Sequence, residues 1–549
     1  MTLAPSSDPQ KEGDITSRTD TSSASAAERS PDATAPASPK ERQLGFIIAA
    51  LMLSMLMSSL GQTIFAAALP TIVGELGGAN HMSWVITAFL LGQTIAMPLF
   101  GKLGDQLGRK GLFIGANALF VLGSLLGGLS VNMAMLIIAR VMQGVAGGSM
   151  IILSQAITAD VTTARERGKY MGIMGSVFGV SSVLGPVLGG WFTDGPGWRW
   201  GLWLNIPIGI VAITAIWFFL RLPKRQKNLD IDWLGTLTMA LATASLVLFV
   251  TWGGNEYEWG SPLILGLIAS TIIFAAIFVF VESKVSNPLI PLQLFKTRNF
   301  NLTLLAGLAV GIFMFGTLAY MPTYLQMVHA MTPTNAGLMM IPMMIGLMGT
   351  SIVVGNLISR TGRYRFFPIV GMVITGIGLF LLSTMKPETS LITVGIYFFV
   401  FGFGLGCSMQ VLVLIVQNSF PLSMVGTATG TNNFFRQVGG SLGSALVGGL
   451  FTGRLTGQMQ SNLPQAIKDS GEEGARFLQT FNPETDLSSL TPTALHHMPQ
   501  AIADAIQLSY NDSLTPVLLM VCPLAFLSAV ILFFIKEKKL SDRLEPLED

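Results

Sequence analysis

The sequence predicts an all-α integral membrane protein with fourteen transmembrane helices, arranged as six, two inserted and six more. Its 549 residues are 51% hydrophobic and only 11% charged, with a mean hydropathy of +0.60, whereas soluble domains are about one-quarter charged. Fourteen apolar segments each approach the roughly 20 residues that cross a bilayer. A glycine-rich basic turn, GKLGDQLGRK at 101–110, returns in weaker form as GNLISRTGRYR at 355–365.

Residues 1–42 predict a disordered tail, because they are rich in Ser, Thr, Ala and Pro and hold almost no large apolar side chains to bury. The predicted spans follow at about 44–69, 82–101, 112–130, 134–156, 168–192, 201–220, 233–252, 262–281, 302–325, 336–358, 366–384, 391–417, 430–451 and 514–535.

The two glycine-rich turns follow the second span of the first six and the second span of the last six. This predicts two related six-helix bundles, residues 43–225 and 291–535, with two inserted helices in 226–290. Residues 453–512 predict a long outer loop before the last span, either a small ordered cap or a flexible strand, and 536–549 a terminal tail. Two related bundles in a membrane predict a carrier with its cargo site between them.

The distribution of Lys and Arg predicts that both termini are cytoplasmic. With that orientation the basic loops fall inside, including both glycine-rich turns, because positive residues near a span resist translocation. The few basic residues left outside are Arg199, Lys386, Arg454, Lys468 and Arg476. We expect a multi-pass protein of the plasma membrane.

Composition also argues against other classes. The net charge of +2 gives no reason to expect nucleic acid. Cys407 and Cys522 lie in apolar runs, and the histidines lack a ligand spacing, so neither a disulfide nor a metal site is predicted. No GxxxxGK[ST] or HExxH motif occurs, which predicts a protein that is not an enzyme, uses no ATP and has no cofactor. The expected partners are the lipid bilayer and a small-molecule substrate.

Several motifs resemble those of the major facilitator superfamily. GKLGDQLGRK resembles its signature loop, ARVMQGVAGG at 139–148 its helix-four motif, and GPVLGG at 185–190 its helix-five antiporter motif. WRWGLWLNIPIG at 198–209, NPLIPLQLF at 287–295 and NNFFRQVGGSLG at 432–443 resemble the fourteen-helix drug:proton antiporter branch. The resemblance covers about 44–451 and implies the major facilitator fold, with proton-driven export of drugs.

The signature loop predicts a conformational latch. Its glycines let two helix ends approach closely, and Asp105 can accept hydrogen bonds from exposed backbone N–H groups or pair with Arg109. A purely topogenic basic turn is the alternative, but it explains neither Asp105 nor the glycine spacing. The predicted latch residues are Gly101, Gly104, Asp105, Gly108, Arg109 and Lys110.

The helix-five motif predicts a hinge, because small residues give smooth packing faces and proline bends a helix. The predicted hinge residues are Gly185, Pro186, Gly189 and Gly190. Ordinary packing of small residues is the alternative.

Arg140 is a functional candidate because a charge within the membrane is costly and usually faces a cavity or a partner. Gln143, about one turn further on, is expected on the same face. For Arg436, near the start of the thirteenth span, the side chain could instead extend to the cytoplasmic interface.

The chain departs from the antiporter pattern at one position. The resemblance implies an acidic residue in the first helix just ahead of a Thr-Ile pair, but SLGQTIF has Gly61 there and Gln62 next. No Asp or Glu lies deep within any predicted span. The residues therefore support transport more firmly than proton coupling, and we hypothesise that Arg140 favours anionic or zwitterionic cargo.

The leading hypothesis is a secondary exporter of amphipathic small molecules that works by alternating access and is coupled to protons. Export of a lipid or glycolipid without proton antiport is the alternative, and a membrane sensor built on a carrier scaffold is a remote one. Uncharged polar, aromatic and methionine side chains at membrane depth suit a cavity. The predicted lining residues are Gln62, Gln93, Gln155, Tyr320, Tyr324 and Met340.

Overall fold

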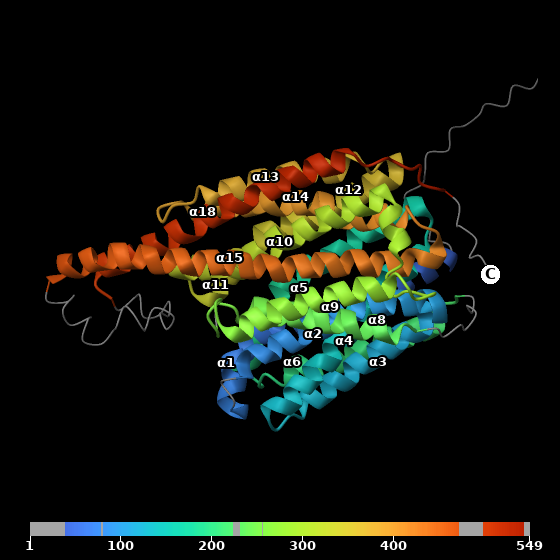
Figure 1. Ribbon diagram of the computed structural model, residues 1–549, viewed down its shortest axis with the longest axis horizontal. Helices are drawn as coiled ribbons and strands as arrows, with labels where there is room; N and C mark the ends of the chain where they lie inside the picture. The colour runs from blue at the N-terminus through green and yellow to red at the C-terminus, as the bar shows by residue number, and fades with distance from the viewer. Residues whose placement is uncertain (1–38, 78–80, 223–230, 255, 472–497, 543–549) are drawn as a thin grey trace, which may run out of the picture. The chain divides into compact units, whose positions relative to one another are not determined.

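The computed structural model describes residues 39–77, 81–222, 231–254, 256–471 and 498–542 (Figure 1). Most of the tail predicted to be disordered, residues 1–38, therefore lies outside the described residues. Residues 43–549 form one compact unit, and residues 1–42 are a second unit.

The described residues are almost entirely helical. The first group is α1 (Pro39–Leu76), α2 (Met82–Leu107), α3 (Arg109–Gly128), α4 (Met133–Val161), α5 (Ala164–Asp194), α6 (Trp200–Trp203) and α7 (Asn205–Phe219). The inserted pair is α8 (Trp233–Trp252) and α9 (Pro262–Glu282). The last group is η2 (Leu292–Lys296), α10 (Arg298–Val328), α11 (Pro333–Leu338), α12 (Ile341–Thr361), α13 (Phe366–Ser383), α14 (Leu391–Gln417), η3 (Leu422–Met424), α15 (Val425–Asp469) and α18 (Gln500–Phe533).

The predicted all-α membrane fold is confirmed. Among the described residues, 13 helical segments are long and apolar enough to cross a membrane, with α6–α7 and α11–α12 each counted as one. The long helix α15 supplies the fourteenth, and it packs against α2, α10 and α18. Its many glycines and polar residues, beginning with VGTATGTNNFFRQVGG, keep its hydropathy below that of the other spans.

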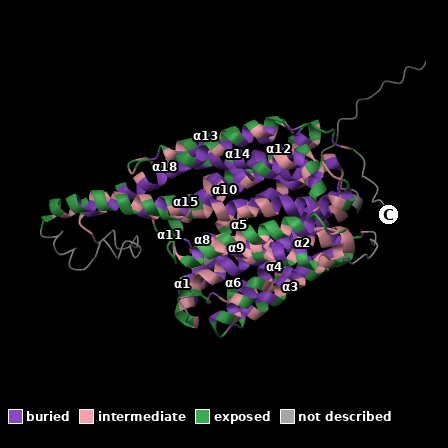
Figure 2. Ribbon diagram, in the orientation of Figure 1, coloured by how far each residue is buried: buried purple, intermediate pink, exposed green. Residues whose placement is uncertain are grey.

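Apolar side chains on the outside of the helices identify the lipid-facing surface. The most apolar span, α9, is only 11% buried, whereas α14 is 83% buried. Figure 2 shows the contrast, with exposed residues along α9 and α13 and buried ones along α14. A helix that is apolar all round and unburied needs a nonpolar solvent, so these faces fit the hydrocarbon core of a bilayer.

The two halves have separate hydrophobic cores. One core is built from α1, α2, α3, α4, α5 and α7, with Val413 of α14 as its contribution from the second half. The other is built from α10 to α18, with Ala164 as its contribution from the first half. The two largest clusters therefore lie mainly within one half each, whereas a smaller cluster of Ala159 with Leu422 and Val425 crosses between the halves. Two bodies that move against each other need such largely separate cores.

The halves meet along two helix pairs, which we call the seam: α2 with α15, and α5 with α12. Glycines make both contacts close. A Cβ on Gly172 would collide with the backbone of Ser351, and one on Gly355 with the backbone of Gly168. Backbones this close leave no room for a side chain, as in other small-residue helix contacts in membranes.

One predicted boundary is wrong. Residues 453–512 were expected to be a loop, but α15 continues to Asp469 and α18 begins at Gln500. In this extension Met459 and Leu463 of α15 are buried, as are Ile502 and Ile506 of α18. The apolar spacing of three and four residues in these amphipathic stretches is a helix signal that mean hydropathy does not detect. Residues 472–497 lie outside the described residues.

The glycine contact yields a first prediction. Gly355→Ala should push α5 and α12 apart, because overpacking a tight contact costs about 1–3 kcal/mol. A cysteine at Ile358, which is 1% exposed and lies against Gly168, should then react with N-ethylmaleimide roughly tenfold faster, the equivalent of about 1.4 kcal/mol. Both native cysteines are buried and give a low background.

Gly349→Ala is the matched control, since a Cβ there meets nothing within 4 Å on the same helix. Equal labelling rates for the two variants would contradict the proposed tightness of this contact.

Candidate functional site

Arg109 lies at the centre of the predicted latch and is fully buried. Its guanidinium donates to Asp105 Oδ1 at 2.7 Å and to Asp160 Oδ1 at 2.5 Å. It also donates to the backbone carbonyls of Ala156 at 2.7 Å and Leu422 at 2.9 Å. Because Leu422 belongs to the second half, this one side chain joins α2, α3 and α4 to the segment that leads into α15.

Asp105 completes the crossing of the seam. Its carboxylate accepts from the backbone N–H of Gly426 at 3.1 Å and of Thr427 at 2.6 Å, and from Thr427 Oγ1 at 2.8 Å. These N–H groups belong to the first turn of α15, which has no intrahelical partners for them. The carboxylate therefore caps a helix of the opposite half, where the helix dipole favours negative charge.

The glycines of the loop have distinct roles. Gly101 packs against Gly426 and Gly430 so closely that a Cβ would collide with the α15 backbone. Gly104 packs against a leucine of α4. Gly108 links α2 to α3 with φ +90°, a conformation that strongly favours glycine.

Lys110 lies apart from the rest of the predicted latch. Its Nζ donates to the backbone carbonyls of Trp217 at 2.9 Å and Leu220 at 2.6 Å. Both belong to the last turn of α7, so Lys110 caps a helix of its own half and does not cross the seam.

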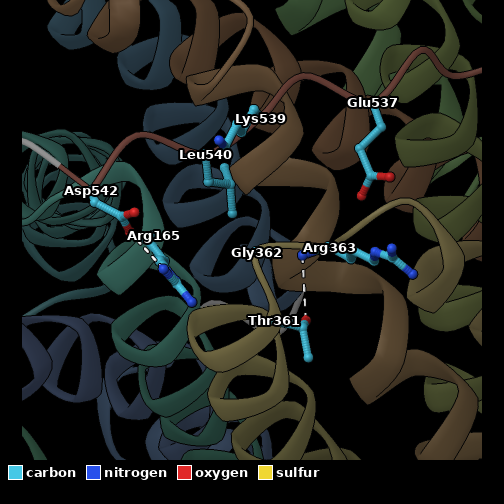
Figure 3. Close-up of a pocket in the computed structure, with 8 residues that line it drawn as sticks. All are labelled: Arg165, Thr361, Gly362, Arg363, Glu537, Lys539, Leu540 and Asp542. Carbon is cyan, nitrogen blue, oxygen red and sulfur yellow. Dashed lines mark hydrogen bonds and ion pairs between the residues drawn. The ribbon is translucent and has the colours of Figure 1, made fainter.

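A second contact across the seam was not predicted. Arg165, in the first turn of α5, donates to the carbonyls of Ser359 at 2.7 Å and Arg360 at 2.5 Å in the last turn of α12. It also pairs with Asp542 at 2.9 Å and binds the Ser541 carbonyl through its own N–H. Figure 3 shows it at one side of a cleft of about 380 Å³ lined by Arg165, Thr361, Gly362, Arg363, Glu537, Lys539, Leu540 and Asp542.

The segment that follows α18 is held in place on the second half. Asn299 of α10 exchanges two hydrogen bonds with the backbone of Lys536, at 2.7 and 3.0 Å. The Glu537 carboxylate accepts from the N–H of Tyr364 at 2.7 Å, and the Tyr364 hydroxyl accepts from the N–H of Lys538. Burial raises the pKa of the Tyr364 phenol, which therefore stays protonated at neutral pH. We call the helix ends around Asp105, Arg165 and this segment the latch end.

Arg140 and Gln143 contact each other, as the sequence predicted. Arg140 donates to Gln143 Oε1 at 2.9 Å, to the Gly61 carbonyl at 2.8 Å and to the Val85 carbonyl at 3.1 Å. Gln143 in turn donates to Ser124 Oγ at 2.8 Å. The arginine thus ties α1, α2, α3 and α4 together within the first half.

Two aromatic rings complete this environment. The guanidinium carbon of Arg140 lies 4.2 Å from the ring centroid of Phe65 and 4.3 Å from that of Phe89, an arrangement that stabilises a cation. A Cβ on Gly61 would lie 2.9 Å from the ring of Phe120. At position 61, where the resemblance implies an acidic side chain, the backbone carbonyl of Gly61 binds Arg140. The ring of Phe120 fills the space that a side chain at position 61 would need.

The predicted hinge lies on α5, a helix of the seam, but Gly185 makes its close contact within the first half. Gly185 packs against Thr63 of α1, and a Cβ there would collide with that side chain. Gly190 is open, since a Cβ added to it would meet nothing within 4 Å, and Gly189 is buried. Pro186 belongs to α5, but its side chain lies outside the described residues. A hinge here remains a prediction.

Two of the predicted cavity residues lie at the seam or directly beside it. Gln155 of α4 and Gln93 of α2 are buried, and one amide atom of each, Gln155 Nε2 and Gln93 Oε1, has no hydrogen-bond partner among the described residues. Gln62 of α1 is only partly buried, next to the carbonyl that binds Arg140.

The other three predicted residues lie within the second half. Tyr324 donates to Asn511 Oδ1 at 2.8 Å, which links α10 to α18, and Tyr320 donates to the Ser444 carbonyl at 3.3 Å. Met340 is buried in the same core. The six predicted residues therefore do not form one site.

Among the polar side chains at the seam, Asn433 and Ser351 were not predicted. Asn433 of α15 donates to Gln155 Oε1 at 3.0 Å, and Gln417 of α14 donates to the Gln155 carbonyl at 3.2 Å. Gln410 and Ser351 lie at the other helix pair beside α5, with their side-chain polar atoms unpaired among the described residues. In the sequence each of these residues is visible as a polar residue within an apolar span. The sequence does not show which neighbouring helix its side chain faces.

The comparisons agree with this architecture. The family model of the Major Facilitator Superfamily matches residues 51–444, so the chain belongs to that superfamily. The chain is 33% identical to the multidrug transporter protein MdtP of Bacillus subtilis over 92% of this chain and 95% of that protein. It is 31% identical to multidrug resistance protein 3 of the same organism, over 91% and 96%.

Among solved structures, the human organic anion transporter MFSD10 aligns with a TM-score of 0.56 at 15% identity, covering 89% of this chain and all of that one. The proton:xylose symporter XylE aligns at 0.52 and 13%, covering 90% and 96%. These two likenesses show the fold. The multidrug relatives place the chain in the drug-efflux branch of the superfamily, as its motifs indicated.

The latch yields a second prediction. Asp105→Asn keeps the size of the side chain but removes the charge that binds Arg109 and the α15 N-terminus. We expect the free energy of unfolding to fall by about 2–3 kcal/mol, because buried, charge-assisted hydrogen bonds are lost. Thermal unfolding in detergent measures this loss.

Glu166→Gln is the matched control for Asp105→Asn, because Glu166 is an exposed carboxylate at the same end. It should lose less than about 1 kcal/mol. If both variants unfold at the same temperature, Asp105 does not have the proposed role.

Position 61 yields a third prediction. Gly61→Ala should destabilise the protein by about 1–3 kcal/mol, because the new methyl group overlaps the Phe120 ring. Adding Phe120→Leu should recover part of that loss. The control, Gly45→Ala on the same helix, meets nothing within 4 Å, and a loss of stability in the control as large as that of Gly61→Ala would refute the explanation.

Proposed function

We propose that this chain exports amphipathic, largely hydrophobic small molecules by alternating access of its two halves. The observation that carries the proposal is the cap of Asp105 on α15, a charged and reversible contact between two bodies that have separate cores. The multidrug transporters to which the chain is 31–33% identical support the class of substrate.

The latch end is the closed end of this proposed cycle. Asp105 and Arg165 both belong to the first half, and with opposite charges they bind the end of α15 and the end of α12 in the second half. Opening at this end would require both contacts to break. Because the contacts are hydrogen bonds and ion pairs to helix termini, water entering the seam can replace them at a modest net cost.

We propose that the latch end faces the cytoplasm and that the protein lies in the plasma membrane. The described residues at or next to this end include many cations, as the rule that positive loops remain inside requires. They include Lys102, Arg109, Lys110, Arg165, Arg167, Lys169, Arg360, Arg363, Arg365, Lys536, Lys538 and Lys539.

Proton coupling is part of the proposal and rests on the resemblance to antiporters. The tight contact between Gly61 and Phe120 argues that coupling does not use a carboxylate at position 61. Arg140 is satisfied by carbonyls and aromatic rings, so it needs no acid at that position.

The test is transport in proteoliposomes. We expect the purified protein to move a fluorescent amphipathic dye, faster with an imposed pH gradient than without one, and Asp105→Asn to slow this by at least about tenfold. A labelled phospholipid is assayed in parallel. Movement of the phospholipid but not of the dye would favour the lipid-exporter alternative, and movement of neither would refute the proposed function.

A further inference from the structure

Arg436 is a second buried arginine, and it lies at the seam. It is 7% exposed and stands ten residues after Gly426, where Asp105 caps α15. At about 1.5 Å per residue this places it roughly 15 Å from the latch end, close to the middle of a hydrocarbon core about 30 Å thick. The predicted alternative, a side chain that extends to the interface, is therefore wrong.

The partners of Arg436 differ from those of Arg140. Arg140 makes three hydrogen bonds and contacts two aromatic rings. For Arg436 the described residues provide one hydrogen bond, from Nη2 to Asn433 Oδ1 on its own helix. None of the four ion pairs among the described residues involves either arginine. Arg140 is thus satisfied by its own half, whereas most donors of Arg436 are free for another acceptor.

The groups around Arg436 continue this polar site across the seam. Asn433, which accepts from Arg436, donates to Gln155 of the opposite half at 3.0 Å. Gln155 Nε2 is buried and has no partner among the described residues, and neither has Oε1 of Gln417, whose amide donates to the Gln155 carbonyl. Buried amide groups without partners are costly, and a ligand with a polar head would satisfy them.

The pseudo-equivalent helix has no such cation. Arg436 is the eleventh residue after the start of α15, and the eleventh residue after the start of α5 is Gly175. Gly175 lies against Ser351 and Gln410, which are neutral. The cation at this depth therefore lies on the α2–α15 side of the seam and has no counterpart at Gly175.

Apolar side chains lie next to this polar site. Ile151 is one helical turn from Gln155 on α4, and Met97 is one turn from Gln93 on α2. Together with Ile152 they form a buried cluster against which Phe178 of α5 packs. A ligand that meets both surfaces would carry an anionic head and an apolar body.

From this arrangement we infer that Arg436, supported by Asn433 and Gln155, binds the anionic group of the transported molecule, and that carboxylate-bearing amphiphiles are the preferred substrates. This inference rests on the proposed export function and assigns its substrate class. It moves the role of anion recognition from Arg140, where the sequence had suggested it, to Arg436. Arg140 is instead a packing residue of the first half.

The test compares a fluorescent carboxylic acid, 11-(dansylamino)undecanoic acid, with its methyl ester and with the cation tetraphenylphosphonium. Wild-type protein in detergent should bind the acid at least about tenfold more tightly than the ester. Arg436→Gln should remove this preference by weakening acid binding ten- to a hundredfold, because a carboxylate then loses its charged partner. Arg436→Lys should keep part of it.

Arg140→Gln is the matched control, and it should lower the unfolding temperature while the ratio of acid to ester affinity stays unchanged. Loss of the ratio in Arg140→Gln but not in Arg436→Gln would overturn the inference. The inference would also be overturned if wild-type protein binds and transports the ester and the cation with no preference for the acid. This outcome can be measured even if no Arg436 variant folds. If wild-type protein neither binds nor transports any of the three probes, the proposed function fails as well.

Discussion

The bond between the Asp105 carboxylate and the first turn of α15 is the interaction on which the described arrangement depends. A helix terminus has N–H groups without partners and a partial positive charge, and here the partner that satisfies them comes from the other half of the molecule. Arg109 holds the carboxylate in place from behind and binds Asp160 and the Leu422 carbonyl as well. Arg109 is thus shared by two carboxylates, and the contact with α15 combines the charge of Asp105 with the geometry of the helix terminus.

The two buried arginines at membrane depth show how one residue type serves two purposes. Arg140 joins four helices of the first half through backbone carbonyls, an amide and two aromatic rings, so its charge is spread over a rigid site. Arg436 lies on a helix of the seam and is bound by a single amide among the described residues. A charge within a membrane is costly unless it has partners. Arg140 finds its partners within the protein, whereas we propose that the transported molecule supplies part of the partners of Arg436.

The chain of polar contacts also connects the inferred site with the latch. Asn433 and Thr429 lie on α15 between Arg436 and the capped first turn, and both contact glutamines of neighbouring helices. A ligand that draws Arg436 or Asn433 away would weaken the link from Asn433 to Gln155 across the seam. Substrate binding would then weaken hydrogen bonds that must also break when the seam opens. Alternating access requires this coupling between binding and opening.

The sequence by itself determined the membrane class, the helix count and the place of the latch loop, because hydropathy, charge bias and glycine spacing are local properties. It could also single out Arg140 and Gln143, since a charge at membrane depth stands out in any span. Only the tertiary structure decided which helix each polar residue faces: Arg165, Asn433 and Gln417 act across the seam, whereas Lys110, Tyr324 and Met340 serve their own half. The physical reason is that the side of a helix that meets a neighbour is set by packing between segments far apart in the chain, and amphipathicity is weak where both lipid and protein interior are apolar.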